Sequence, residues 1–260
     1  SGRLAGKATL IDLYGYSPDS MAISPNAGIH LNWPTSKKGG WWDERSDEEV
    51  KKEYKGDLKK LNDFISRAQF YDEMMTDSED NPNNKQQPDM DKKMQAMREV
   101  VKGDIPIIVS VDAKSDILDV IEWTKNYPDM QFVLAGVRDG WRVADEIAEA
   151  GLPCLVSTLY TPERDYDNYQ RPYQNPGKLH AAGVKVAIAT GGVENVRNAP
   201  YHTGFAASYG LGKQEALKAI TINAAEIFGV SGKLGSIEKG KQANLFIADG
   251  DPFEPMNHIT

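Results

Sequence analysis

Short hydrophobic runs recur along the second half of the chain, and each run is followed by an amphipathic segment. The runs are rich in β-branched residues, as is typical of strands buried on both faces. They are Ile105–Val111, Gln131–Val137, Pro153–Thr158 and Val184–Thr190. The predicted helices are Ser115–Asn126, Arg138–Ala150, a short helix ending near Ala182, and the segments 199–209 and 213–228. This alternation with short connections predicts a parallel sheet with helices outside it.

The first third of the chain has a different pattern. Lys7–Leu13 alternates apolar and polar residues and is predicted to form a strand. The following segment, Asp19–Pro34, is interpreted as short extended pieces broken by Pro25 and Gly28. In this interpretation only five strands fit the parallel sheet.

A long amphipathic helix is predicted to begin after Ser46. Ser46 and Glu49 have the spacing of a capping box, and apolar residues then recur every three or four positions. The polar, proline-broken segment 76–91 predicts a mobile loop or a disordered insert, and the sequence leaves open whether residues 74–93 are ordered. Together these features indicate a helical and polar insertion at about 43–102.

Composition and charge exclude several classes of partner. The chain has 260 residues, 30 Lys and Arg against 38 Asp and Glu, and a net charge of -8, so a nucleic acid is not an expected partner. No apolar run is long enough to span a bilayer, and the first residues lack the apolar stretch of a signal peptide. We therefore expect a soluble chain that does not bind membranes; its compartment is unknown. The single cysteine, Cys154, excludes an intrachain disulfide and a cysteine-based zinc cluster.

The C-terminal part carries a family resemblance. GLGKQEALKAITINAAEIFGV, followed by GKLGSIEKGKQANLFIADGDPFEP, resembles the end of the amidohydrolase superfamily, especially its imidazolonepropionase-like members. The similarity is close over 209–255 and looser from Ile105 onward. Two positions depart from the family pattern, where Ala225 replaces a proline and Asn244 an aspartate.

The resemblance implies the (β/α)₈ barrel of metal-dependent hydrolases that act on non-peptide carbon–nitrogen bonds. In such enzymes a divalent zinc, iron or manganese ion activates a water molecule. Residues 1–228 would then form a partial barrel with about five of the eight strands. Residues 229–260, which have the turn chemistry of a β-hairpin, would supply strands of an accessory β-sandwich. The chain would be the downstream portion of a longer protein.

Transferring the family's metal ligands to this sequence gives a negative result. The family places a histidine after the fifth strand, another after the sixth and an aspartate after the eighth. The corresponding positions hold Ser110, Gly136 and Gly191, and no His-x-His motif occurs. We therefore expect no metal and no cofactor in this chain. The four histidines are interpreted as surface or packing residues away from strand ends; they are His30, His180, His202 and His258.

Candidate pocket residues follow the predicted strands, because active sites of parallel α/β folds lie at the carboxyl ends of the strands. They are Ser110, Asp112, Arg138 and Glu194. Asp112 could point into the pocket or cap the next helix, and Glu194 could replace the missing aspartate. The loop 159–176, rich in tyrosine and arginine, is the favoured ligand contact.

Two functional hypotheses remain open. The favoured one is a catalytically silent, pseudoenzyme-like relative that keeps the fold and binds a small molecule at the barrel mouth. The alternative is an active metal-dependent amidohydrolase whose missing N-terminal part supplies the His-x-His ligands. The expected macromolecular partner is that missing part or a second copy of the chain.

Overall fold

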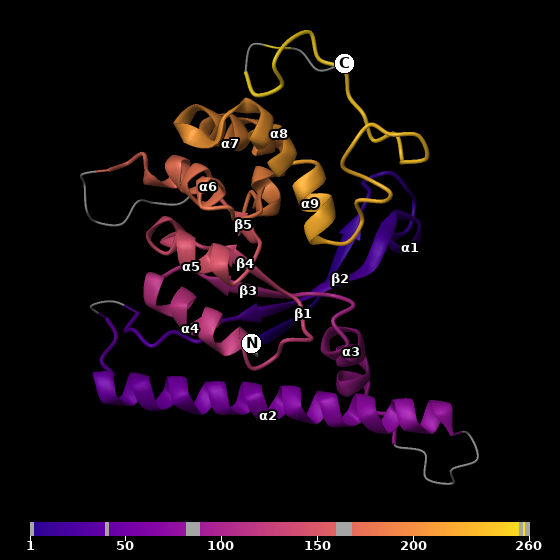
Figure 1. Cartoon of the computed structure of the whole chain (residues 1–260), viewed down its shortest axis with the longest axis vertical. Coiled ribbons are helices and arrows are strands. Elements are labelled where there is room, and N and C mark those ends of the chain that lie inside the picture. Colours follow the sequence, from indigo (N-terminus) through magenta and orange to yellow (C-terminus); the bar gives the residue numbers. More distant parts are fainter. Residues whose placement is uncertain (1–2, 40–41, 82–88, 160–167, 255–256, 258–260) are drawn as a thin grey trace.

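Six strands form one sheet, and they lie side by side in the order in which they occur along the chain. Their bounds are β1 Leu4–Ile11, β2 Ala22–Asn32, β3 Ile107–Val111, β4 Phe132–Gly136, β5 Cys154–Val156 and β6 Val186–Ile188. Strands β2 to β6 are all parallel, and β1 is antiparallel to β2 at one edge. The sheet crosses the middle of the computed structural model, which describes residues 3–39, 42–81, 89–159, 168–254 and 257 (Figure 1).

The strand predicted at Lys7–Leu13 is confirmed as β1, but its place among the parallel strands and the broken interpretation of Asp19–Pro34 are wrong. The segment containing Pro25 and Gly28 is one continuous strand, β2, which begins the parallel series; the Lys7–Leu13 segment belongs to the antiparallel edge strand. Pro25 is tolerated because it lies where β2 pairs only with β1, inside the register shift between the Ala8–Gly28 and Leu10–Ser24 pairs. At Gly28 a side chain would meet the Pro106 carbonyl oxygen at 2.9 Å, so close strand pairing requires glycine here.

Helices connect the parallel strands and cover one face of the sheet more fully than the other. The α-helices are α1 Pro18–Met21, α2 Asp47–Asp80, α3 Lys92–Val101, α4 Lys114–Thr124, α5 Ala144–Glu149, α6 Arg171–Ala181, α7 Ala199–Ala206, α8 Lys213–Ala219 and α9 Ile222–Ile227. Two 3₁₀ segments, η1 Gly140–Arg142 and η2 Val193–Asn198, follow β4 and β6, and a π-helical segment, η3 Ala207–Leu211, follows α7. The predicted helix 213–228 is thus divided into α8 and α9.

The predicted long helix is confirmed as α2, which runs along the bottom of the molecule in Figure 1. Both halves of the capping box form: the Ser46 side chain accepts from the Glu49 amide, and the Glu49 side chain accepts from the Ser46 amide. The helix extends to Asp80, well into the segment expected to be a loop, because residues 76–80 continue its hydrogen bonding. Residues 82–88 of that segment lie outside the described residues.

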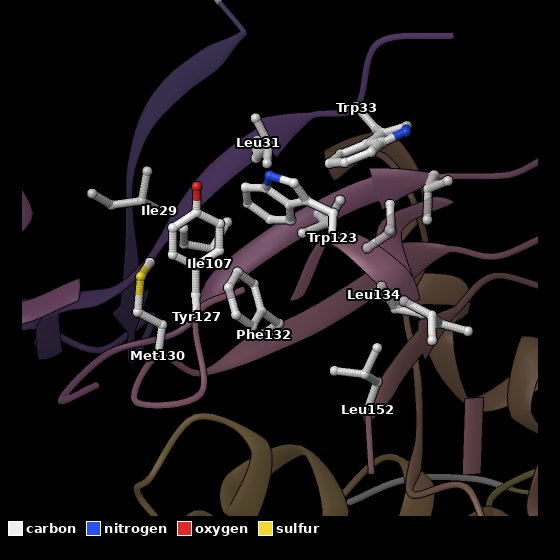
Figure 2. Packing of buried hydrophobic residues seen from close by; sticks show 14 of the residues in the cluster. Ile29, Leu31, Trp33, Ile107, Trp123, Tyr127, Met130, Phe132, Leu134 and Leu152 are labelled. Atoms are coloured by element: carbon white, nitrogen blue, oxygen red, sulfur yellow. The ribbon is translucent and has the colours of Figure 1, made fainter. Parts of the chain in front are cut away.

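An aromatic cluster joins α4 to the sheet. Trp123 packs against Trp33, Tyr127 and Phe132 (Figure 2). The ring centroids are 5.0–5.4 Å apart. Asn62 of α2 accepts hydrogen bonds from the indole of Trp123 (2.8 Å) and the hydroxyl of Tyr127 (3.0 Å). One amide oxygen on α2 therefore satisfies two donors of the cluster and fixes the long helix over α4.

The C-terminal strand prediction is wrong for the described part of the tail. Residues 229–254 form turns and irregular chain, with a single bridge residue at Ala248. A strand needs a hydrogen-bonded partner along its length, and the six strands of the sheet include none from this segment. Its strand-like apolar side chains are consequently exposed; they include Ile237, Leu245, Phe246 and Ile247. None of the described helices is both long and apolar enough to cross a membrane.

Candidate active site

One row of side chains crosses all five parallel strands close to their carboxyl ends. The register pairs the members of the row from strand to strand: Asn32, Ser110, Ala135, Leu155 and Ala187. Side chains alternate between faces along a strand. The neighbours Ile107, Val109 and Val111 belong to the helix-covered core, so this row lies on the opposite face. We call it the Ser110 row.

The Ser110 row offers an amide, a hydroxyl and aliphatic groups. Ser110 stands on this face as expected, but Gly136 does not, because Gly136 pairs with Val111 and Ala135 occupies the place beside Ser110. The sixth-strand position that we assigned to Gly136 is therefore Ala135. His30 lies on the same face as Ser110, paired with Ile108, two residues before the end of β2. The expectation that no histidine lies near a strand end is wrong for His30.

The chain leaves β4 through a strained turn. Gly136 has φ +91°, and Val137 has φ +54°, the only positive φ of a non-glycine residue in the part of the chain that the structure describes. A side chain on Gly136 would lie 2.5 Å from Asp112 Oδ1 and 3.3 Å from the Val111 carbonyl oxygen. Close approach of the carboxylate therefore requires glycine here. Such strain is concentrated at functional sites in proteins.

Asp112 and Arg138 meet at this turn. Arg138 Nε lies 3.2 Å from Asp112 Oδ2, and both side chains are about half exposed. Oδ1 of Asp112 is shielded from solvent and has no hydrogen-bond partner. Burial raises the pKa of the Asp112 carboxyl above its ordinary value, although the nearby Arg138 charge acts in the opposite direction. The structure thus brings together two of the four predicted pocket residues.

Asp112 does not cap the following helix. Ala113 is the N-cap of α4 and makes no side-chain capping bond, whereas Asp139 Oδ2 accepts from the Lys114 amide at 3.1 Å. A backbone amide in the first turn of α4 is thus bonded by a residue of the turn after β4. The Asp112 carboxylate pairs with Arg138 instead. Sequence reasoning missed Asp139, because its role depends on the pairing of β3 with β4.

Glu194 is separate from this pair. It lies exposed in η2, and its carboxylate folds back over Gly192, where a side chain would meet Glu194 Oε1 at 2.2 Å. Its carboxylate also accepts from the side chain of the adjacent Asn195. Gly191 has φ +75° and approaches Ser157 of the neighbouring strand end. These local contacts give no support to Glu194 as a substitute for the family's aspartate.

The remaining histidines differ in burial. His202 on α7 is 3% exposed, its Nδ1 has no hydrogen-bond partner, and burial lowers its pKa. Its backbone carbonyl accepts from Thr158 just past β5, which fixes α7 against the sheet. His180 lies 3.9 Å from Glu215 on the helical side, and His258 lies outside the described residues.

The predicted ligand loop 159–176 is described only in part, because residues 160–167 lie outside the described residues. Its last residues begin α6, whose Arg171 stacks on Trp141. Arg142 and Lys178 contact the same ring. Sequence reasoning singled out Arg171 but missed this cluster. The signal that could have revealed it is the RDGWR segment directly after a buried strand.

The overall fold resembles that of a known amidohydrolase structure. A crystal structure of an amidohydrolase from Thermotoga maritima superimposes with a TM-score of 0.79 and 22% sequence identity, covering 99% of this chain and 66% of that chain. This similarity supports the arrangement of the sheet and helices.

Sequence comparison gives the family. The model of the amidohydrolase family matches residues 43–260, so the chain belongs to the amidohydrolase family. An imidazolonepropionase of Syntrophobacter fumaroxidans is 36% identical over 110 residues. That match covers 40% of this chain and 24% of the relative. The chain thus corresponds to only part of these proteins.

The residues present do not fit the metal that the family resemblance implies. Catalytic zinc sites take three ligands from histidine and carboxylate side chains, whereas the Ser110 row has none of these. Among the residues that the structure describes, no three His, Cys, Asp or Glu side chains are grouped so that they could hold a metal ion.

Proposed function

We propose that this amidohydrolase-family chain binds a small molecule at the carboxyl edge of its sheet and performs no metal-dependent hydrolysis with its own residues. One observation carries the proposal: the Ser110 row crosses five strands without an imidazole or a carboxylate. Hydrolysis of a carbon–nitrogen bond in this family's manner needs such ligands to hold the ion and activate water.

The Asp112–Arg138 pair is the proposed polar contact for the ligand. Both charges are partly exposed beside the strained turn after β4, so a ligand can reach them. A ligand acceptor would contact the Arg138 guanidinium, and a ligand donor would contact Asp112 Oδ2. The shielded Oδ1 packs against Gly136 and takes no part.

Metal analysis of the purified chain tests this proposal. After incubation with zinc, iron or manganese and dialysis, we expect substoichiometric metal and no rise in the unfolding midpoint. The triple variant Asn32→His/Ser110→His/Ala135→His serves as a positive control, because it places three imidazoles on neighbouring strands of one row. We expect this control to retain zinc. A stoichiometric ion in the wild-type chain would overturn the proposal.

The alternative is an active metal-dependent amidohydrolase that takes its remaining ligands from outside these residues. The specific observation in its favour is His30, an imidazole on the face of the Ser110 row. In this proposal the five parallel strands belong to a (β/α)₈ barrel. A stoichiometric ion that is lost in His30→Gln would support it.

A further inference from the structure

Three cationic side chains surround one indole ring just after β4. Trp141 lies in η1, and its ring centroid is 4.8 Å from Arg142 Cζ, 5.0 Å from Arg171 Cζ and 4.7 Å from Lys178 Nζ. An indole has two faces, so at least two of the three cations lie over the same face. We call these four residues the Trp141 cluster.

A buried amide holds the parts of the cluster together. Asn175 of α6 is fully buried; its Oδ1 accepts from the Trp141 amide at 2.9 Å, and its Nδ2 donates to the Val137 carbonyl at 2.9 Å. Arg171 and Lys178 lie on the same helix as Asn175. Helix α6 and its Asn175 side chain therefore hold the indole and two of its cations in place. Such preorganisation of a site lowers the free-energy cost of binding a ligand.

The charges of the cluster are not balanced within the described residues. Arg142 Nε lies 3.5 Å from Asp139 Oδ1, but the ion pairs of the described residues include none for Arg171 or Lys178. Each cation–π contact attracts its charge to the ring. Like charges held around one ring also repel one another. A bound anion would remove the repulsion and leave both ring contacts in place.

We propose that the Trp141 cluster binds the oxyanion group, a carboxylate or a phosphate, of a small molecule. The fork of Arg171 suits two oxygens of one such group, and Lys178 adds a point charge. The net charge of -8 disfavours an extended polyanion, because the rest of the surface repels it. The inference extends the proposed ligand site, since η1 and Arg138 belong to the same connection after β4.

Titration of the full chain with inorganic phosphate and, separately, with glutarate tests the proposal. Binding is measured by calorimetry and by tryptophan fluorescence, with Trp141→Phe identifying the reporter among the five tryptophans. We expect saturable binding of at least one probe. Arg171→Gln/Lys178→Gln should weaken it at least about tenfold, because two charge-assisted contacts are lost.

The matched control is Lys60→Gln/Lys125→Gln, which makes the same charge change at exposed lysines of α2 and beyond α4. Equal affinities of the cluster and control variants would overturn the proposal, as would the absence of saturable binding of both probes to the wild-type chain. Binding of phosphate alone, or of glutarate alone, supports the proposal and assigns the group. Arg171→Lys, which keeps the charge, should lose less affinity than Arg171→Gln, and equal losses would count against the cluster.

Metal content is measured on the same samples. Failure of the anion site leaves the metal result unchanged, so the two proposals fail separately.

Discussion

At the scale of single residues, Gly136 sets the geometry of the candidate site. Its positive φ and the 2.5 Å approach of Asp112 Oδ1 to its Cβ position leave no room for a side chain. We expect Gly136→Ala to destabilise the fold by about 1–3 kcal/mol, the usual cost of a strained backbone position. Urea denaturation measures this loss.

Gly56→Ala is the matched control for that substitution. Gly56 lies inside α2, and a side chain there would meet no atom within 4 Å. Alanine should stabilise the helix by about 0.5–1 kcal/mol. Equal effects of the two glycine substitutions would show that the turn after β4 is not strained.

The raised pKa of Asp112 predicts a pH dependence of stability. A carboxyl whose pKa is higher in the folded state than in the unfolded state binds its proton more tightly when folded. Its stabilising contribution is therefore full below the unfolded pKa and is lost as pH rises through the folded pKa. Relative to Asp112→Asn, the wild-type chain should become more stable as the pH falls from 7 toward 4. Urea unfolding of both proteins across this range measures the difference, and a flat or opposite trend contradicts the prediction.

The sequence predicts which residues follow the strands, but it does not predict the contacts between residues that are distant in the sequence. Asp112 and Arg138 were found because each follows a strand, and position along the chain determines that property. The Asp139 cap of α4 and the Asn175 clamp of Trp141 join residues 25 and 34 positions apart. Such contacts depend on how neighbouring strands and helices pack, and no local pattern encodes them.

At the scale of elements, one amide of α2 satisfies two donors of the aromatic cluster. Asn62 accepts from the indole of Trp123 and the hydroxyl of Tyr127, both on largely buried residues. Asn62→Ala leaves two donors without their acceptor, and we expect a loss of about 1–3 kcal/mol in unfolding free energy. The exposed control Lys59→Ala on the same helix should change it by less than about 0.5 kcal/mol. Thermal and urea unfolding of both variants measure the two losses in unfolding free energy, and equal losses would contradict the prediction.

Periodicity predicted the elements whose faces are buried, including α2, α4 and strands β3 to β6. It was wrong for segments in which hydrogen bonding to a neighbouring strand, and not the local sequence pattern, determines whether a strand forms. Strand β2 contains Pro25 and Gly28, yet pairing with β1 and β3 keeps it continuous. Segment 233–248 has the alternation and turns of a hairpin but lacks a paired strand in the described sheet, so it stays irregular.

At the scale of the whole molecule, helices cover one face of the sheet more fully than the other. The main core lies between the sheet and helices α2 to α6. On the face of the Ser110 row, α9 packs Ile227 against Val133 and Ala187, whereas His30 and Asn32 are exposed. The less covered face is therefore the one that carries the Ser110 row, where we propose that the ligand binds.

The tail creates a second open surface, an apolar groove of about 630 Å³ beside α9. It is lined by Leu10, Phe228, Leu245 and Phe246 among others, and Leu245 and Phe246 are 61% and 56% exposed. Exposed apolar patches bind apolar dyes and partners. We expect the folded chain to increase the fluorescence of anilinonaphthalene sulfonate.

The double variant Leu245→Ser/Phe246→Ser should lose most of that increase, because it removes the apolar wall of the groove. The double variant Val193→Ser/Val196→Ser removes exposed apolar side chains from η2, outside the groove, and should keep it. Unchanged unfolding midpoints exclude dye binding to unfolded chain. Equal losses in both double variants would mean that the dye reports general surface hydrophobicity and that the tail forms no distinct groove.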